Sequence, residues 1–100
     1  VKARECYQLG LPLARSLMDQ PRLAIILTGL AETNFLLNEK SAARTQLEEA
    51  VAIWRELKEP ARESSTLSLL AGVYAALGDQ FKAAEIYRQL LSGWRVALPR

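Results

Sequence analysis

The chain repeats itself at an interval of forty residues. A shift by forty positions superposes identical residues in the two later segments of the sequence: Arg22/Arg62, Leu27/Leu67, Leu30/Leu70, Ala31/Ala71, Leu37/Leu77, Ala43/Ala83, Trp54/Trp94 and Arg55/Arg95. The opening segment follows the same register, with matches at Ala3/Ala43, Arg4/Arg44, Arg15/Arg55 and Leu17/Leu57. Constant spacing without insertions indicates one structural unit used repeatedly. We therefore expect a single domain with a partial repeat at 1–20 and full repeats at 21–60 and 61–100.

Each full repeat is predicted to form two α-helices. Mostly apolar residues recur with the 3.6-residue period of a helix in four stripes, Leu23-Leu27-Leu30-Asn34-Leu37, Ala43-Leu47-Ala50-Trp54-Leu57, Leu67-Leu70-Tyr74-Leu77 and Ala83-Tyr87-Leu90-Trp94. No segment shows the alternation that is typical of a β-strand. The sequence therefore predicts an all-α fold of about five helices, arranged as antiparallel pairs.

The breaks between these stripes carry residues that end and begin helices. Gly78 can adopt the left-handed conformation that ends a helix, and Asp79 can cap the next one. Asn38 stands where the second repeat has Gly78, and asparagine is the next most tolerant residue there. Pro21 and Pro60 stand at expected helix starts, where a missing amide donor costs nothing.

Pro12 is the residue that fits the repeat least well. The register places it inside the second helix of the partial repeat, two residues after Gly10. A proline within a helix removes a hydrogen bond and clashes with the preceding turn. We therefore expect a kink or a restart of the helix near Leu11.

Composition excludes most catalytic chemistry. The chain has no histidine, so the commonest general base and zinc ligand are missing, and it shows no Gly-rich phosphate loop or paired metal ligands. Cys6 is the only cysteine, so no internal disulfide can form and a cytoplasmic setting is expected; we interpret Cys6 as a buried or incidental thiol. Thirteen basic and eleven acidic residues are interspersed for a net charge of +2. We therefore expect no enzyme activity, no metal or cofactor, no nucleic-acid binding and no membrane span.

Residues 70–87 resemble the tetratricopeptide repeat. The family sets a leucine, a small residue, a tyrosine, a glycine, an alanine and an aromatic residue at fixed offsets, which Leu70, Ala71, Tyr74, Gly78, Ala83 and Tyr87 match. The first full repeat matches at Leu30, Ala31 and Ala43, but Asn34 replaces the tyrosine. A forty-residue unit is similar to the longer variants in kinesin light chains and in bacterial signalling ATPases and transcriptional activators. The resemblance implies a superhelix of stacked helix pairs, in which Ala71 and Ala83 allow close approach and the tyrosines fill the space around them.

The same resemblance implies a binding groove on the concave side, lined by the first helix of each pair. The family's groove positions fall on Ile25, Thr28, Glu32, Phe35 and Leu36 in one repeat and on Ser65, Ser68, Gly72, Ala75 and Ala76 in the next. Chaperone-binding members clamp a terminal carboxylate at positions that are Thr28, Glu32, Ser68 and Gly72 here, so chaperone tails are disfavoured. The small residues of the second repeat either admit a bound segment or serve only the packing of neighbouring repeats.

Arginines and tryptophans recur beside this groove. Arg22 and Arg62 either contact an acidic partner or, as we favour, are solvated rim residues paired with Glu59 or Glu63. Trp54 and Trp94 continue the apolar stripe of a second helix, so structural anchoring is favoured over stacking with Arg55 and Arg95. The serine and threonine cluster at 64–68 can accept a phosphate group, although hydroxyls on a helix surface are the commoner explanation.

The leading hypothesis is a non-catalytic scaffold that binds a protein or peptide within a larger bacterial regulatory protein. A chain of two and a half units has an uncovered terminal helix, so Leu90, Leu91 and Leu98 are expected to mediate self-association or to dock a neighbouring domain. The alternative hypothesis is an inducer-sensing module of a signalling ATPase or transcriptional activator, which would require a deep pocket ringed by polar groups.

Overall fold

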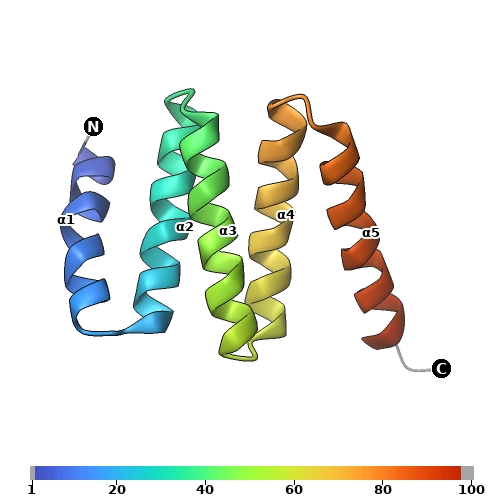
Figure 1. Cartoon of the computed structure of the whole chain (residues 1–100), viewed down its shortest axis with the longest axis horizontal. Coiled ribbons are helices and arrows are strands. Elements are labelled where there is room, and N and C mark those ends of the chain that lie inside the picture. Colours follow the sequence, from blue (N-terminus) through green and yellow to red (C-terminus); the bar gives the residue numbers. More distant parts are fainter. Residues whose placement is uncertain (1, 98–100) are drawn as a thin grey trace.

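The computed structural model describes residues 2–97, with side chains described from residue 4 to residue 91. Within this range it contains five α-helices, α1 (Lys2–Ser16), α2 (Gln20–Leu36), α3 (Lys40–Glu56), α4 (Pro60–Ala76) and α5 (Gln80–Ala97). Each helix packs mainly on its neighbours in the chain, and the helices follow one another in a row (Figure 1). The predicted all-α fold of antiparallel helix pairs is confirmed.

The helix boundaries follow the interval of forty residues. Helix α4 begins and ends forty residues after α2, and α5 begins forty residues after α3. Because each helix contacts mostly its immediate neighbours, the molecule is a thin slab with principal extents of 45 × 31 × 16 Å. The division into one partial and two full repeats stays a prediction.

The four turns between helices share one geometry. Met18, Asn38, Lys58 and Gly78, spaced twenty residues apart, all have positive φ, at 54°, 67°, 56° and 88°. The amide of the following residue then donates to a carbonyl five residues back, as Asp19 does to Ala14 and Glu39 to Asn34, at 3.1 and 2.8 Å. The left-handed conformation was predicted for Asn38 and Gly78. Met18 and Lys58 adopt the same conformation with some strain, because a Cβ disfavours this region.

The helix starts also follow the sequence prediction in part. The Asp79 carboxylate accepts a hydrogen bond from the Lys82 amide at 3.1 Å, so the predicted cap is present. Asp19 accepts one from the Arg22 amide at 3.3 Å and caps α2 in the same way. Pro21 and Pro60 lie in the first turns of α2 and α4, where their missing amide hydrogens leave no carbonyl unpaired.

Helix α1 contradicts the restart predicted at Pro12. It runs as one α-helix from Lys2 to Ser16 with Pro12 inside it. The side chain of Pro12 is exposed, while Ala14 and Leu11 pack against α2 and α3 in the core. Docking of this apolar face on the neighbouring helices therefore holds α1 together across the proline.

Pro12→Ala is expected to raise the free energy of unfolding by about 2 kcal/mol. Proline within a helix is about 3 kcal/mol less favourable than alanine, and part of this gain is offset because alanine makes the unfolded chain more flexible. No buried contact of Pro12 is lost, because its side chain is exposed. Urea denaturation followed by far-UV circular dichroism measures the shift. An unchanged or lower midpoint would show that α1 contributes little to the cooperative fold.

Two clusters of buried side chains form the core. The first joins α2, α3, α4 and α5 through residues such as Ala31, Leu47, Leu70 and Ala83. The second joins α1, α2 and α3 through Ala14, Leu23, Ala24, Leu27, Ala50, Ile53 and Trp54. The alanines have between 0 and 3 % of their surface exposed, so small side chains stand where neighbouring helices come closest.

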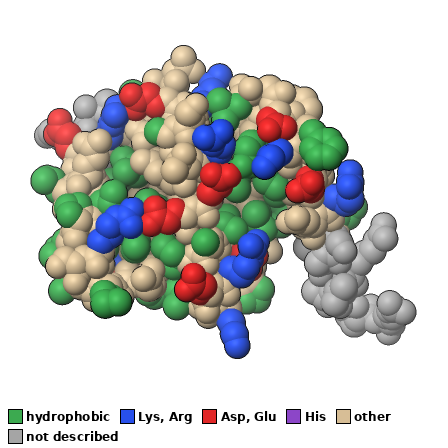
Figure 2. All heavy atoms as spheres, viewed as in Figure 1, with side chains coloured by type: hydrophobic (Ala, Val, Ile, Leu, Met, Phe, Trp, Pro, Cys, Tyr) green, Lys and Arg blue, Asp and Glu red, His purple; other side chains and the backbone are tan. Residues whose placement is uncertain are grey.

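Ion pairs cross the surface between helices. The Arg15 guanidinium of α1 donates two hydrogen bonds to Glu49 of α3, at 2.7 and 3.0 Å, and this contact raises the pKa of Arg15. Arg4 of α1 pairs with Glu39 at 2.8 Å. Basic and acidic side chains are mixed over the visible face, without a large patch of one sign (Figure 2). Because these pairs are exposed, each contributes little to stability.

Tyr74 is the buried aromatic residue of α4. It has 6 % of its surface exposed, its hydroxyl donates to the Glu48 carboxylate of α3, and the Lys82 ammonium lies 5.7 Å from its ring centre. Burial and the hydrogen bond to Glu48 raise the pKa of Tyr74 from 10.0 to about 12. Tyr87 was predicted to share this role but is half-exposed at 50 %, because no described residue covers its side of α5.

The raised pKa predicts a loss of stability in alkali. An unfolded tyrosine ionises near pH 10.0, whereas folded Tyr74 keeps its proton up to about pH 12, so its contribution is complete below pH 10 and is lost as the pH rises through 12. Relative to Tyr74→Phe, the wild-type chain should lose about 1 kcal/mol between about pH 8 and about pH 11. Urea denaturation of both proteins at the two pH values measures the difference. Parallel losses in both proteins would contradict the raised pKa.

Candidate functional site: the groove between α2 and α4

An apolar cavity of about 290 Å³ lies between α2 and α4. Its lining comes from three helices: Ala31, Glu32, Phe35 and Leu36 of α2, Leu47 of α3, and Leu69, Gly72 and Val73 of α4. Leu36 is 84 % exposed and Leu69 is 38 % exposed, so two leucines border the opening while buried Leu47 lies at the base. Glu32 is the one ionisable residue of this lining.

Gly72 keeps this cavity open. Apart from Gly72, its two chain neighbours and the adjacent backbone of α4, no atom of the described residues lies within 4 Å of the position that a Cβ on Gly72 would occupy. A glycine inside a helix costs about 1 kcal/mol relative to alanine, and here the missing side chain does not serve close packing of helices. Close packing of helices therefore does not explain why residue 72 is a glycine. Ala75 differs, because it is half-buried and packs against the first core cluster.

A second, wider hollow of about 580 Å³ lies nearer the start of α2 and α4. Polar groups from both helices line it, together with one aromatic residue each from α1 and α3; the lining residues are Tyr7, Ile25, Thr28, Gly29, Glu32, Trp54, Ala61, Arg62, Ser65 and Thr66. The hydroxyls of Thr28, Ser65 and Thr66 donate to helix carbonyls at 2.8, 3.1 and 2.8 Å. Their oxygens can still accept hydrogen bonds from a bound segment.

Arg62 is held at the border of this hollow. Its guanidinium lies 5.1 Å from the centre of the Trp54 ring and 3.8 Å from the Glu59 carboxylate. The expected pairing with Glu59 is therefore present, whereas Glu63 pairs with Arg55 at 3.0 Å. Arg22, its counterpart in the first repeat, pairs with Asp19 at 3.2 Å and lines neither hollow.

The two hollows bring most of the predicted groove residues together. The apolar cavity contains Glu32, Phe35, Leu36 and Gly72, and the wider hollow contains Ile25, Thr28, Glu32, Ser65 and Arg62. Glu32 lines both and joins them into one surface, which we call the α2–α4 groove. Four predicted residues line neither hollow: Arg22, Ser68, Ala75 and Ala76.

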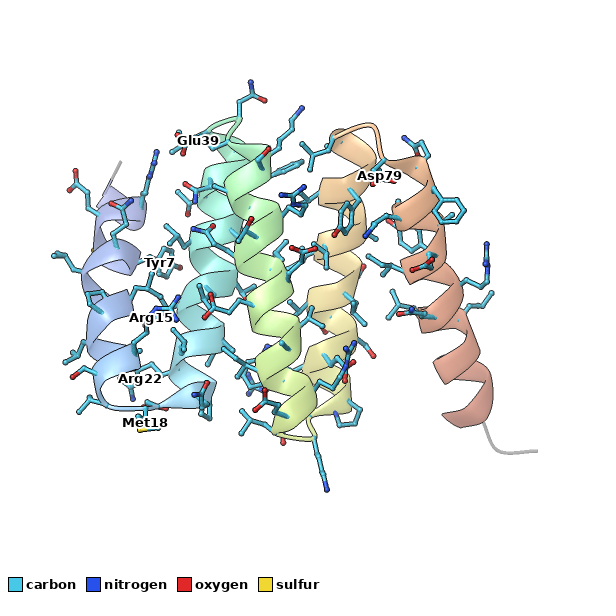
Figure 3. All side chains as sticks on the ribbon, viewed as in Figure 1. Tyr7, Arg15, Met18, Arg22, Glu39 and Asp79 are labelled. Atoms are coloured by element: carbon cyan, nitrogen blue, oxygen red, sulfur yellow. The ribbon has the colours of Figure 1, made fainter. Side chains whose placement is uncertain are left out.

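The groove also contains residues that the sequence reasoning missed. Leu69 lies outside the apolar stripe of α4, and a leucine outside that stripe, three residues before Gly72, was the signal that could have identified it. Tyr7 belongs to the partial repeat, but its ring reaches across to Gly29 of α2, and Figure 3 places it between α1 and α2. Tyr7, Leu47 and Tyr87 are forty residues apart, and this shared repeat position was the signal that could have identified Tyr7.

Two of the residues predicted for self-association, Leu90 and Leu91, lie elsewhere, on α5. Leu91 is 59 % exposed, whereas Leu90 is half-buried and packs against the first core cluster. Leu98 and the side chain of Trp94 lie outside the described residues. Cys6 is exposed on α1, so of the two interpretations, a buried thiol or an incidental one, the buried thiol is wrong.

Residues 23–57 match the family model of the tetratricopeptide repeat. The matched segment contains nearly all of α2 and α3 with the turn between them, which is one helix pair of the fold. No curated protein shows significant similarity to the chain. This match supports a tetratricopeptide repeat assignment; such repeats generally mediate protein–protein interactions and are typically non-catalytic. None of the described helices is long and apolar enough to cross a membrane.

Proposed function

We propose that the α2–α4 groove binds a segment of a partner protein and that one apolar side chain of this segment enters the cavity beside Gly72. The observation that carries this proposal is the open position above Gly72, in a cavity whose other walls are mainly aliphatic and aromatic. Burial of an apolar side chain contributes about 1.5–3 kcal/mol, which is enough to anchor a short segment. A volume of about 290 Å³ suits one such side chain together with its neighbouring backbone.

Charge at the groove defines the preferred segment further. Among the described residues no cation lies within 4.0 Å of Glu32, which is exposed and lines both hollows. The Arg62 guanidinium lines the wider hollow from the first turn of α4. We therefore expect a lysine or arginine of the partner near Glu32 and an acidic residue near Arg62. This arrangement would set the direction in which the segment lies.

Gly72→Leu tests the proposal without endangering the fold. The new side chain has open space, and leucine favours a helix interior, so the free energy of unfolding should stay equal or rise by about 0.5–1 kcal/mol. Peptides selected on the wild-type chain from a random-peptide library serve as the probe. We expect Gly72→Leu to weaken their binding by about tenfold or more, because the leucine occupies the cavity.

Ser64→Leu is the matched control, because it adds the same side chain at an exposed position of α4 that lines neither hollow. It should leave the affinity within about twofold of the wild type. Isothermal titration calorimetry measures both affinities. Equal affinity of the wild type and Gly72→Leu for every selected peptide would overturn the assignment of the cavity.

Small-molecule sensing is the weaker alternative. An inducer site would need an enclosed cavity with convergent polar groups. The more apolar cavity offers only Glu32 among ionisable groups, and the hydroxyls of the wider hollow already donate to their own helices. These features favour a peptide chain that lies along the groove.

The setting in a cytoplasmic bacterial regulatory or signalling protein stays a prediction from the resemblance of the "LEEAVAIWREL" segment to repeats in such proteins. Self-association through Leu90 and Leu91 also stays a prediction. A concentration series by light scattering, with Leu91→Asp as the comparison, tests it. A monomer at all concentrations would exclude α5 as a surface for self-association.

A further inference from the structure

The wider hollow contains the counterpart of the cavity beside Gly72, one repeat earlier in the chain. Three residues that line the cavity come from α3 and α4: Leu47, Leu69 and Gly72. The residues forty positions before them all line the wider hollow: Tyr7, Gly29 and Glu32. The same repeat positions therefore form an apolar cavity in one place and bring together an aromatic ring and a carboxylate in the other.

Gly29 allows the Tyr7 ring to reach this place. The Cε1 and Oη atoms of Tyr7 each lie 2.7 Å from the position that a Cβ on Gly29 would occupy, so any larger residue would overlap the ring. Tyr7 is half-buried and lies between α1 and α2 (Figure 3). The ring is thus held against the backbone of α2 and still lines the wider hollow.

Glu32 is the acidic group beside this ring. It follows Gly29 by three residues on α2, and residues at this spacing lie on one helix face with their Cβ positions about 5–6 Å apart. Glu32 is exposed, and within the part of the chain that the structure describes no cation lies within 4.0 Å of it. The ring and the carboxylate therefore form a pair that lacks a cation.

The border of the same hollow shows what such a pair holds. The Arg62 guanidinium lies 5.1 Å from the centre of the Trp54 ring and 3.8 Å from the Glu59 carboxylate. A guanidinium is planar and less strongly hydrated than the ammonium group of lysine, so it can lie over an aromatic ring and pair with a carboxylate at the same time. Arginine therefore suits the place beside Tyr7 and Glu32 better than lysine.

We propose that Tyr7 and Glu32 form a subsite for an arginine side chain of the bound segment, with the guanidinium over the Tyr7 ring and paired with the Glu32 carboxylate. This subsite rests on the proposed function, because it provides a second anchor for the segment whose apolar side chain enters the cavity beside Gly72. Glu32 lines both hollows, so the two anchors are adjacent. The partner is thereby defined as a segment that carries an arginine next to an apolar anchor residue.

Peptides selected on the wild-type chain from the random-peptide library test the subsite. We expect the selected peptides to share an arginine. Replacement of this arginine by citrulline, which has nearly the same shape but no charge, should weaken binding by about tenfold, and replacement by lysine by about threefold. Isothermal titration calorimetry measures each affinity.

Substitutions in the protein identify the groups that hold the arginine. Glu32→Gln should weaken binding of the arginine peptide by about fivefold but leave the citrulline peptide within about twofold. Glu85→Gln is the matched control, because it removes an exposed carboxylate that lines neither hollow. Tyr7→Leu should weaken the arginine peptide by about threefold, whereas Tyr7→Phe, which keeps the ring, should stay within about twofold.

The outcomes separate this subsite from the proposed function. Gly72→Leu should weaken the arginine and citrulline peptides by the same factor, because it blocks a different anchor. Selected peptides without a shared arginine would overturn the subsite, as would equal binding of the arginine, lysine and citrulline forms or equal effects of Glu32→Gln on the arginine and citrulline peptides. If Gly72→Leu has no effect while Glu32→Gln discriminates between these two peptides, the cavity is wrong and the arginine subsite stands. A selection that yields no binding peptide would overturn both.

Discussion

Trp54→Ala is expected to lower the free energy of unfolding by about 3–5 kcal/mol. Trp54 is 4 % exposed and packs with Ala14 of α1 and Leu23 and Leu27 of α2 in the second core cluster, so its removal leaves a cavity where three helices meet. A domain of this size has only about 5–15 kcal/mol of stability, so most of the margin would be lost. Urea denaturation followed by far-UV circular dichroism measures the change.

Arg62→Met separates packing from the charge–ring contact in this prediction. The Arg62 guanidinium lies over the Trp54 ring, and an exposed contact of this kind contributes only about 0.5–1 kcal/mol. Methionine keeps much of the aliphatic stem and removes the charge. We expect the loss from Arg62→Met to be well below that from Trp54→Ala. A loss of similar size from both substitutions would mean that the ring is held by the arginine rather than by the core.

Trp54 also shows what the sequence could and could not predict. Its burial follows from its phase in the apolar stripe that begins at Ala43, because residues three or four apart lie on one helix face. The cation that lies over the Trp54 ring could not be predicted in this way. The adjacent Arg55 was the obvious candidate in the sequence, but it pairs with Glu63, and Arg62 from the next helix takes the place over the ring. Such contacts depend on how α3 and α4 cross, which no local pattern encodes.

The turns between helices were also predictable from the sequence only in part. Asn38 and Gly78 were identifiable because both residue types tolerate positive φ. Met18 and Lys58 have the same backbone conformation without any such preference, so the tertiary packing of the helices on either side imposes it. The repeat itself predicts these two turns, because Lys58 lies midway between Asn38 and Gly78 and Met18 lies forty residues before Lys58. Local residue preference alone could not have found them.

The candidate site was predictable where family positions coincide with an open surface. Glu32, Phe35, Leu36 and Gly72 meet at one cavity, but Ser68 and Ala76 do not reach it. The placement of α2 relative to α4 and the position of Leu69 decide which residues border the cavity. Neither is encoded in the 3.6-residue period, which assigns residues to a face of one helix but does not place two helices relative to each other.

Leu47→Ala and Tyr87→Ala form the second prediction, because one repeat position is tested in two environments. Leu47 is 1 % exposed in the first core cluster, so its truncation is expected to cost about 2–5 kcal/mol. Tyr87 has the larger side chain but is 50 % exposed on the outer face of α5, so its truncation should cost less than about 1 kcal/mol. Urea midpoints of the two variants give the comparison directly.

The opposite ranking would be informative, because side-chain size alone predicts that loss of a tyrosine costs more than loss of a leucine. In the repeat, however, the cost depends on whether a following helix covers the position, as α4 covers Leu47. In a variant in which residues 1–97 are followed by a copy of residues 18–60, the cost of Tyr87→Ala should therefore rise toward that of Leu47→Ala. If Tyr87→Ala were as costly as Leu47→Ala in the 100-residue chain, the outer face of α5 would already be covered in solution. That result would contradict the exposure of Tyr87 in the single chain.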